Sequence, residues 1–178
     1  MWHFSETNKL CRYGDGREIV PGQTLKVEGP VKMCELGLHA CKNILDACEY
    51  APGPYIWWVE LSGEVVHGSD KSVATERTAF WGYDATEVLR AFSRKIALDA
   101  VLNHWDETKF GKFPEVTRQY LETGDESLRS AAESAAESAA WSAARSAAES
   151  AARSANNSLL EKMILEGRPD DGQESRVE

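Results

Sequence analysis

The chain has 178 residues, a formal net charge of −9 and 42% hydrophobic residues. Because an acidic surface repels phosphate backbones, this balance argues against nucleic acid as a partner. No apolar run approaches the roughly 20 residues that a helix needs to cross a bilayer, so a membrane is not an expected partner either.

The first residues and the cysteines predict a cytoplasmic protein. The opening MWHFSE lacks the basic and apolar regions of a signal peptide. The four cysteines include no Cys-x-x-Cys pair, whereas structural zinc sites usually take their ligands from such close pairs. We therefore expect free thiols in a reducing compartment and no metal site.

Short strands separated by turns are expected in the first 54 residues. Pro21-Gly22 is a turn signal between expected strands at 19–20 and 24–28. A short buried strand is expected at 36–40. A two-turn helix is expected at 43–50, because its apolar residues recur at helical spacing.

The clearest strand covers 55–61, where aromatic and β-branched residues dominate. Both of its faces carry large apolar side chains, which is typical of a central strand. Ser62-Gly63 breaks or bulges this strand, which resumes over 64–67. A more polar strand is expected at 72–81.

Helical patterns follow the strands. Asp84 to Glu87 forms a capping box, which predicts a helix running to about His104. Pro114 suits the first turn of a shorter helix that ends near Gly124. Strands first and helices later indicate an α+β domain over residues 1–124.

A long Ala/Ser-rich helical arm is expected over residues 125–167. From Ser130 the tetrapeptide Ser-Ala-Ala-x repeats, and alanine is the best helix former. Asn156-Asn157 is a weak point at which the arm can break, so one helix and a hairpin both remain open. The polar tail, residues 168–178, is expected to be disordered.

The arm is expected to mediate self-association into a homo-oligomer. A four-residue repeat turns about 400°, so its variable residues drift around the helix instead of forming one face. Trp141 is the one large apolar residue of the repeat and the natural anchor for a contact. An apolar patch follows, onto which a second chain or the domain itself could dock: Leu159, Leu160, Met163 and Ile164.

The compact domain resembles a family of uncharacterised proteins of bacteriophages and prophages. The segments that carry the resemblance are GLHAC, YAPG, VELSGEV and KSVATER, between about residues 9 and 100. Alanine-rich repeats after the domain also look typical of phage members. The resemblance implies a protein that acts in the cytoplasm of a bacterial host, and it implies no particular activity.

A weaker resemblance is to ADP-ribosyltransferase-like domains. The motifs of that fold occur here in the same order: the strand motif Gly37-Leu38-His39, a short helix at 46–51 and the strand motif Val59-Glu60-Leu61. The resemblance implies an NAD pocket and a carboxylate near the nicotinamide ribose, which Glu60 or Glu76 would supply. The sequence departs from it at His39, where an aromatic residue is usual, and it lacks a clear first motif, for which His3 is a poor substitute.

Each candidate residue has a structural interpretation beside the functional one. His39 lies in a short strand and serves either as a base or as a hydrogen-bonded structural residue. Lys71 and Arg77 form either a solvated strand face or the lining of an anion or nucleotide pocket. No confident catalytic residue follows from the sequence, and His39, Glu60 and Glu76 are the candidates.

The favoured function is that of a phage accessory protein that works by binding. A host protein or a nucleotide is the expected ligand, and a host defence factor is the expected target. The alternatives are an ADP-ribosyltransferase-like enzyme that uses NAD and a structural component of the virion. No cofactor is expected outside the enzyme alternative.

Overall fold

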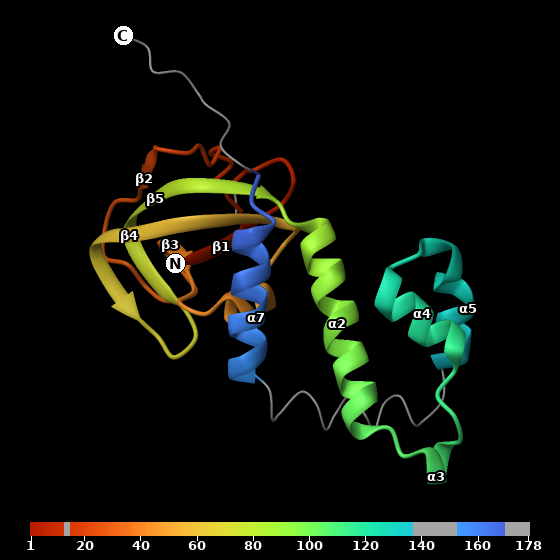
Figure 1. Cartoon of the computed structure of the whole chain (residues 1–178). Helices are drawn as coiled ribbons and strands as arrows, with labels where there is room; N and C mark the ends of the chain where they lie inside the picture. The colour runs from red at the N-terminus through yellow and green to blue at the C-terminus, as the bar shows by residue number, and fades with distance from the viewer. Residues whose placement is uncertain (13–14, 137–152, 170–178) are drawn as a thin grey trace. The chain divides into compact units, whose positions relative to one another are not determined.

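The computed structural model describes residues 1–12, 15–136 and 153–169 (Figure 1). The strands are β1 (Trp2–Ser5), β2 (Thr24–Lys26), β3 (Leu38–Ala40), β4 (Tyr55–His67) and β5 (Ser72–Asp84). The helices are α1 (Ile44–Glu49), α2 (Thr86–His104), α3 (Glu107–Phe110), α4 (Glu115–Thr123), the 3₁₀ helix η1 (Glu126–Leu128), α5 (Arg129–Ala136) and α7 (Arg153–Glu166). An antiparallel sheet combined with helices confirms the α+β class.

The described residues form two compact units. The first comprises residues 1–86 together with 160–169, and the second comprises the described residues between Glu87 and Leu159. The boundary expected at residue 124 therefore falls inside the second unit. The last part of the expected arm, from Leu160, belongs to the first unit.

The first unit is built on a curled antiparallel sheet with the strand order β1-β4-β5-β2. As expected, β4 is central, between β1 and β5, and β3 pairs with β5 beside β2. A bridge joins Trp2 of β1 to Cys41 just after β3, and each residue's N–H donates to the other's carbonyl oxygen over 2.8 Å. Because β1 and β3 lie at opposite edges, this bridge brings the two edges of the sheet together.

The inner face of the curled sheet holds an apolar core. Strand register places His3, Trp57 and Gly82 side by side on this face, since directly paired residues point the same way. Glycine is required at 82, because a Cβ there would lie 2.4 Å from Cε3 of Trp57. The buried members of the core are Ile19, Leu25, Leu38, Ala40, Trp57, Val59 and Ala79.

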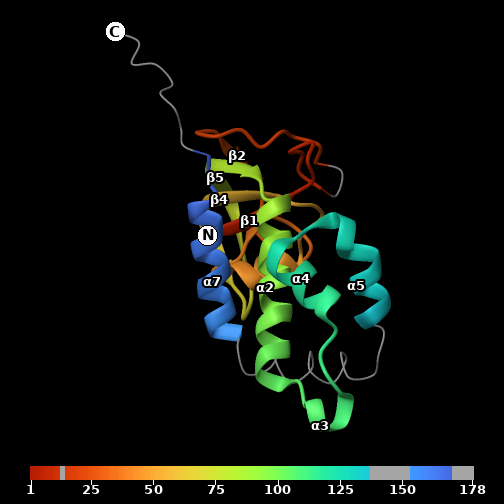
Figure 2. The same ribbon diagram turned by 45° about the vertical axis from the view of Figure 1, so that its right-hand side comes forward.

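The outer face of the same sheet is aromatic and is covered by the C-terminal part of α7 (Figure 2). Trp2 packs edge-on against Trp58 and Trp81, with ring centroids 4.7 and 6.0 Å apart. Two residues of α7 are completely buried, Leu160 and Ile164. These side chains of the expected self-association patch are therefore occupied within the chain.

Two polar contacts fix α7 on the outer face. The Tyr83 hydroxyl donates to the carbonyl oxygen of Ile164 over 2.7 Å, and this bond is buried. The Arg168 guanidinium lies 4.9 Å from the ring centroid of Trp81. Burial raises the pKa of the Tyr83 hydroxyl to about 12, so the group stays protonated and remains a donor at neutral pH.

The second unit is helical. Its core consists of Val101, Phe113 and Leu121, with Trp105 packed edge-on against Phe113 at 4.9 Å. Helices α4 and α5 lie side by side in Figures 1 and 2. The buried Thr117 hydroxyl of α4 donates to the carbonyl oxygen of Ala132 in α5 over 3.3 Å.

Several elements differ from the expectations. Strand β1 was not expected, and residues 19–20 form no strand, although Ile19 is buried. Asp84 caps α2 by accepting from the backbone and hydroxyl of Thr86, in place of the expected bond from the N–H of Glu87. Helix α7 continues through Asn156-Asn157, so no break occurs there.

Trp141, the expected anchor of the arm, lies outside the described residues, so its role stays a prediction. Within the described ranges, every helix is too short or too polar to span a bilayer.

Candidate functional site

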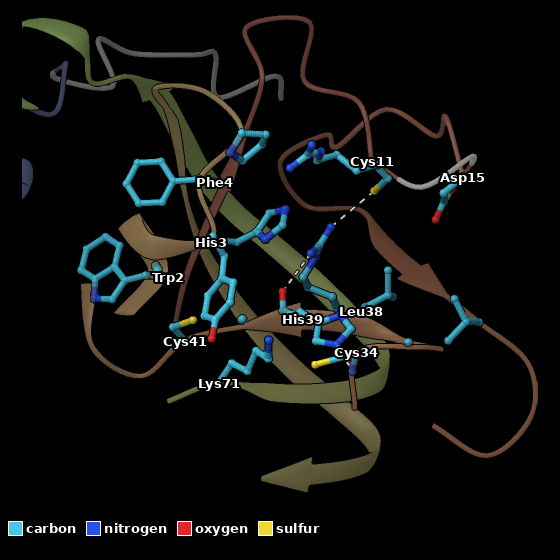
Figure 3. Close-up of a pocket in the computed structure, with 18 of the residues that line it drawn as sticks. Trp2, His3, Phe4, Cys11, Asp15, Cys34, Leu38, His39, Cys41 and Lys71 are labelled. Carbon is cyan, nitrogen blue, oxygen red and sulfur yellow. Dashed lines mark hydrogen bonds between the residues drawn. The ribbon is translucent and has the colours of Figure 1, made fainter. Parts of the chain in front are cut away.

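A cavity of about 450 Å³ lies within the first unit (Figure 3). Strands β1, β3 and β5 contribute to its lining, together with the segment after β1, the segment before β3 and the end of α1. Its lining combines apolar and aromatic side chains with a few polar groups, which is the usual composition of a small-molecule site. The polar groups are Arg77, Lys71, Arg12, Asp15, Glu35, His3 and His39.

Arg77 is the most unusual residue of this cavity. It is 3% exposed, and its register with Leu25 and Leu61 places it on the inner face. Its Nη1 donates to the carbonyl oxygen of His39 over 3.0 Å, and its Nη2 donates to Sγ of Cys11 over 3.4 Å. Within the described ranges its Nε has no hydrogen-bond partner and Arg77 forms no ion pair.

A buried guanidinium without a counter-ion is costly. Burial lowers the pKa of Arg77, because the charged form loses its hydration. Arginine nevertheless stays charged in proteins. Buried charges are usually paired, and an unpaired one destabilises the folded state. Arg77 therefore marks a position at which an anion would be strongly stabilised.

His39 is held neutral in a defined tautomer. Its Nε2 accepts from the backbone N–H of Cys34 over 3.3 Å, which leaves the ring proton on Nδ1. Burial, then Lys71 and Arg77, lower its pKa. Cys34 has a φ of 65°, a left-handed conformation that non-glycine residues adopt at some energetic cost.

His3 enters the cavity from β1. Burial lowers its pKa well below 6.5, and the nearby Arg77 and His39 lower it further. Within the part of the chain that the structure describes, no hydrogen bond engages its ring nitrogens. Figure 3 shows the His3 and His39 rings in the same cavity.

Lys71 and Tyr50 line the cavity next to each other. Nζ of Lys71 lies 3.9 Å from the centroid of the Tyr50 ring. The Tyr50 hydroxyl donates to the carboxylate of Asp70, and this bond raises the pKa of Tyr50 and lowers that of Asp70. Tyr50 remains 45% exposed, so it presents an aromatic surface beside a cation.

The two carboxylates of the lining form ion pairs with cations outside it, and two of its thiols are uncharged. Asp15 pairs with Arg17 at 2.5 Å, and Glu35 pairs with Lys32 at 2.7 Å. The hydrogen bond from Arg17 lowers the pKa of Asp15. Burial raises the pKa of Cys11, and it raises that of Cys41 to about 12, so both thiols are uncharged at neutral pH. The lining therefore carries three cationic side chains, Arg12, Lys71 and Arg77, and its two carboxylates each pair with a cation outside it.

The structure brings together three of the residues singled out from the sequence: His39, Lys71 and Arg77. The two candidate carboxylates do not line the cavity. Glu60 is exposed on β4, and Glu76 pairs with Lys26 at 2.7 Å and accepts from the Ser62 hydroxyl over 3.2 Å. His3, Cys11 and Cys34 were not expected here, because only long-range pairing brings them to β5.

No group of three or more His, Cys, Asp or Glu side chains in the described ranges is arranged to hold a metal ion. Residues 6–91 match the model of a family described as a domain of unknown function, DUF7666. The matched segment includes Arg77, Lys71 and His39 but not β1. Neither the curated proteins nor the solved structures contain a significant match to the chain.

Proposed function

We propose that this chain works by binding, and that the cavity around Arg77 is its site for an anionic small molecule. One observation carries the proposal: a guanidinium that is 3% exposed, forms no ion pair within the described ranges and has an unsatisfied Nε. Proteins commonly tolerate such a destabilising group where function requires it. A bound anion would supply the missing counter-charge.

The ligand class follows from the donors and the size of the cavity. Arginine presents a planar set of N–H donors that matches carboxylate and phosphate oxygens. A volume of about 450 Å³ lies within the range of small-molecule sites and leaves room for more than the anionic group. Tyr50 offers a partly exposed ring for an aromatic moiety. A nucleotide combines these features.

The wider role rests on the resemblance to phage and prophage proteins. A small binding protein made in a bacterial cytoplasm could counter a host defence factor by removing a nucleotide or by occupying a host protein. Self-association through the Ala/Ser-rich arm would then set how many sites one assembly presents. A structural role in the virion is the alternative, and analysis of purified particles for the protein distinguishes the two.

An ADP-ribosyltransferase-like activity has less support from the geometry. Such an enzyme needs a carboxylate near the nicotinamide ribose, and Glu60 and Glu76 do not line the cavity. Incubation with labelled NAD and a bacterial lysate tests this activity, with His39→Ala and Glu60→Ala as comparisons. Label transfer that depends on either residue would establish the enzyme.

The binding proposal is tested by calorimetric titration of the full chain with sulfate, phosphate, ATP and NAD. At least one probe should bind, and Arg77→Met should weaken that binding at least tenfold, because the variant removes the buried cation. Lys26→Met is the matched control: it also removes one positive charge, but from an exposed ion pair with Glu76. Equal loss in both variants, or no binding by any probe, would overturn the proposal.

A further inference from the structure

His3 is a second group of the cavity whose bonding capacity is unused. It projects from β1 onto the inner face, on which Arg77 also lies. Its half-buried ring lines the same cavity as Arg77 and His39, close enough for both to act on it electrostatically. Within the described ranges, the His3 ring has no hydrogen bond and Nε of Arg77 has no acceptor, so both groups can still bond to a ligand.

We propose that His3 is a binding residue of the anion site, and that it takes up one proton as the anion binds between its ring and Arg77. This inference rests on the binding function proposed above. It assigns a role to β1, which lies outside the matched domain segment. It also makes the affinity of the site depend on pH.

The surroundings of His3 explain the proton uptake. In the empty cavity the imidazolium is disfavoured by burial and by the cation of Arg77. An anion that contacts both groups cancels the repulsion from Arg77 and attracts the imidazolium. Protonated His3 then donates to the anion, as a neutral acceptor nitrogen cannot. The other charged groups of the lining are Arg12, Asp15, Glu35 and Lys71.

His39 is less suited to this role. Its Nε2 already accepts from the N–H of Cys34, so protonating that nitrogen would place two donors against each other. Its Nδ1 already carries the ring proton in this tautomer. Lys71 adds a further cation that opposes protonation of His39. The geometry therefore assigns the proton to His3 and leaves His39 a neutral donor.

The test uses sulfate, whose charge stays constant between pH 6 and 8, as the probe for the full chain. The Cε1–H resonances of ¹³C-labelled histidines are titrated with and without saturating sulfate, and His39→Gln, His67→Gln and His104→Gln assign the spectrum. We expect sulfate to move the midpoint of His3 upward by about one pH unit or more, equivalent to a tenfold or larger effect. His67 lies outside the cavity lining, bonded to Ser72, and its midpoint should not move.

Affinity supplies the second readout. Sulfate should bind the natural chain more tightly at pH 6 than at pH 8, by a ratio that grows as the midpoint of His3 in the complex rises above pH 6. The His3→Gln variant cannot titrate at this position and should lose that part of the ratio. His67→Gln should retain the full ratio. Binding that needs Arg77 but leaves the His3 midpoint and the ratio unchanged would overturn the role of His3 and leave the binding function standing. If sulfate and the other probes all fail to bind, both proposals fall.

Discussion

The two faces of the sheet in the first unit are covered in opposite ways. The aromatic part of the outer face is covered by α7, whose Leu160 and Ile164 are completely buried. The inner face has an apolar core too, but it also borders a cavity with a buried Arg77 that forms no ion pair within the described ranges. Packing on the outer face lowers the free energy of the folded state. On the inner face, the buried cation of Arg77 raises it. The contrast separates the residues that stabilise this fold from those that equip it for a ligand.

Removal of α7 side chains should have the largest effect on stability. Ile164→Ala or Leu160→Ala should lower the free energy of unfolding by about 2–5 kcal/mol, because each leaves a cavity in a closed interface. Urea titration followed by tryptophan fluorescence measures the loss. Leu165→Ala, on the same helix but 52% exposed, is the control and should cost about 0.5 kcal/mol or less. Equal losses in the two kinds of variant would contradict the closed outer face.

A methyl group added on the inner face should have an intermediate effect. Gly82→Ala would place its Cβ 2.4 Å from the ring of Trp57 and 2.6 Å from the carbonyl oxygen of Ile56. Because the oxygen belongs to the backbone and cannot move away easily, we expect a loss of about 1–3 kcal/mol. The bond from Nε1 of Trp57 to Oγ of Ser5 should weaken as the ring shifts. A change smaller than about 0.5 kcal/mol would show that the contact is not tight.

Arg77→Met should cost almost no stability. The substitution removes the desolvation cost of a buried cation but also the hydrogen bond to the carbonyl oxygen of His39. Because these two contributions oppose each other, the free energy of unfolding should change by about 1 kcal/mol or less. Urea titration of the ligand-free protein measures it, with Lys26→Met alongside. A loss of several kcal/mol would identify Arg77 as a structural residue and would remove the contrast between the two faces.

The stability of the folded chain should also depend on pH. The folded-state pKa values of His3 and His39 are lowered from 6.5, so below that pH the unfolded chain binds more protons than the folded chain. The free energy of unfolding should therefore decrease as the pH falls from 7.5 to 5.5. His3→Gln should reduce this decrease, and saturating sulfate should oppose it in the natural chain. A profile that is flat over this window would contradict a neutral His3 in the folded chain.

The parts of the fold that the sequence predicted are those with strong local patterns. The aromatic run of β4 and the strand-like composition of β5 identified the central pair, and the capping residue Asp84 located the start of α2. Strand β1 was missed, because four residues form a strand only through pairing with β4. Helix α7 crosses Asn156-Asn157 despite their weak propensity, and burial of its next turns offsets that weakness.

The candidate site was predictable by residue type but not by proximity. His39, Lys71 and Arg77 were singled out as polar groups on or beside short strands, and the structure places all three around one cavity. Their arrangement with His3 depends on the register of β1 with β4 and on the curl of the sheet, which involve residues far apart in the chain. Glu60 and Glu76 were also candidates by residue type, but neither lines the cavity. A residue on a strand can lie on either face of the sheet, and its type alone does not say which.

The bridge between Trp2 and Cys41 also bears on how the chain behaves at high concentration. Exposed strand edges are templates on which other chains can add strands and aggregate. In this sheet, two edges that would otherwise be available are hydrogen-bonded to each other at that point. Mutations that open the bridge should therefore be felt first as a loss of soluble yield during expression, before any defect in ligand recognition becomes measurable.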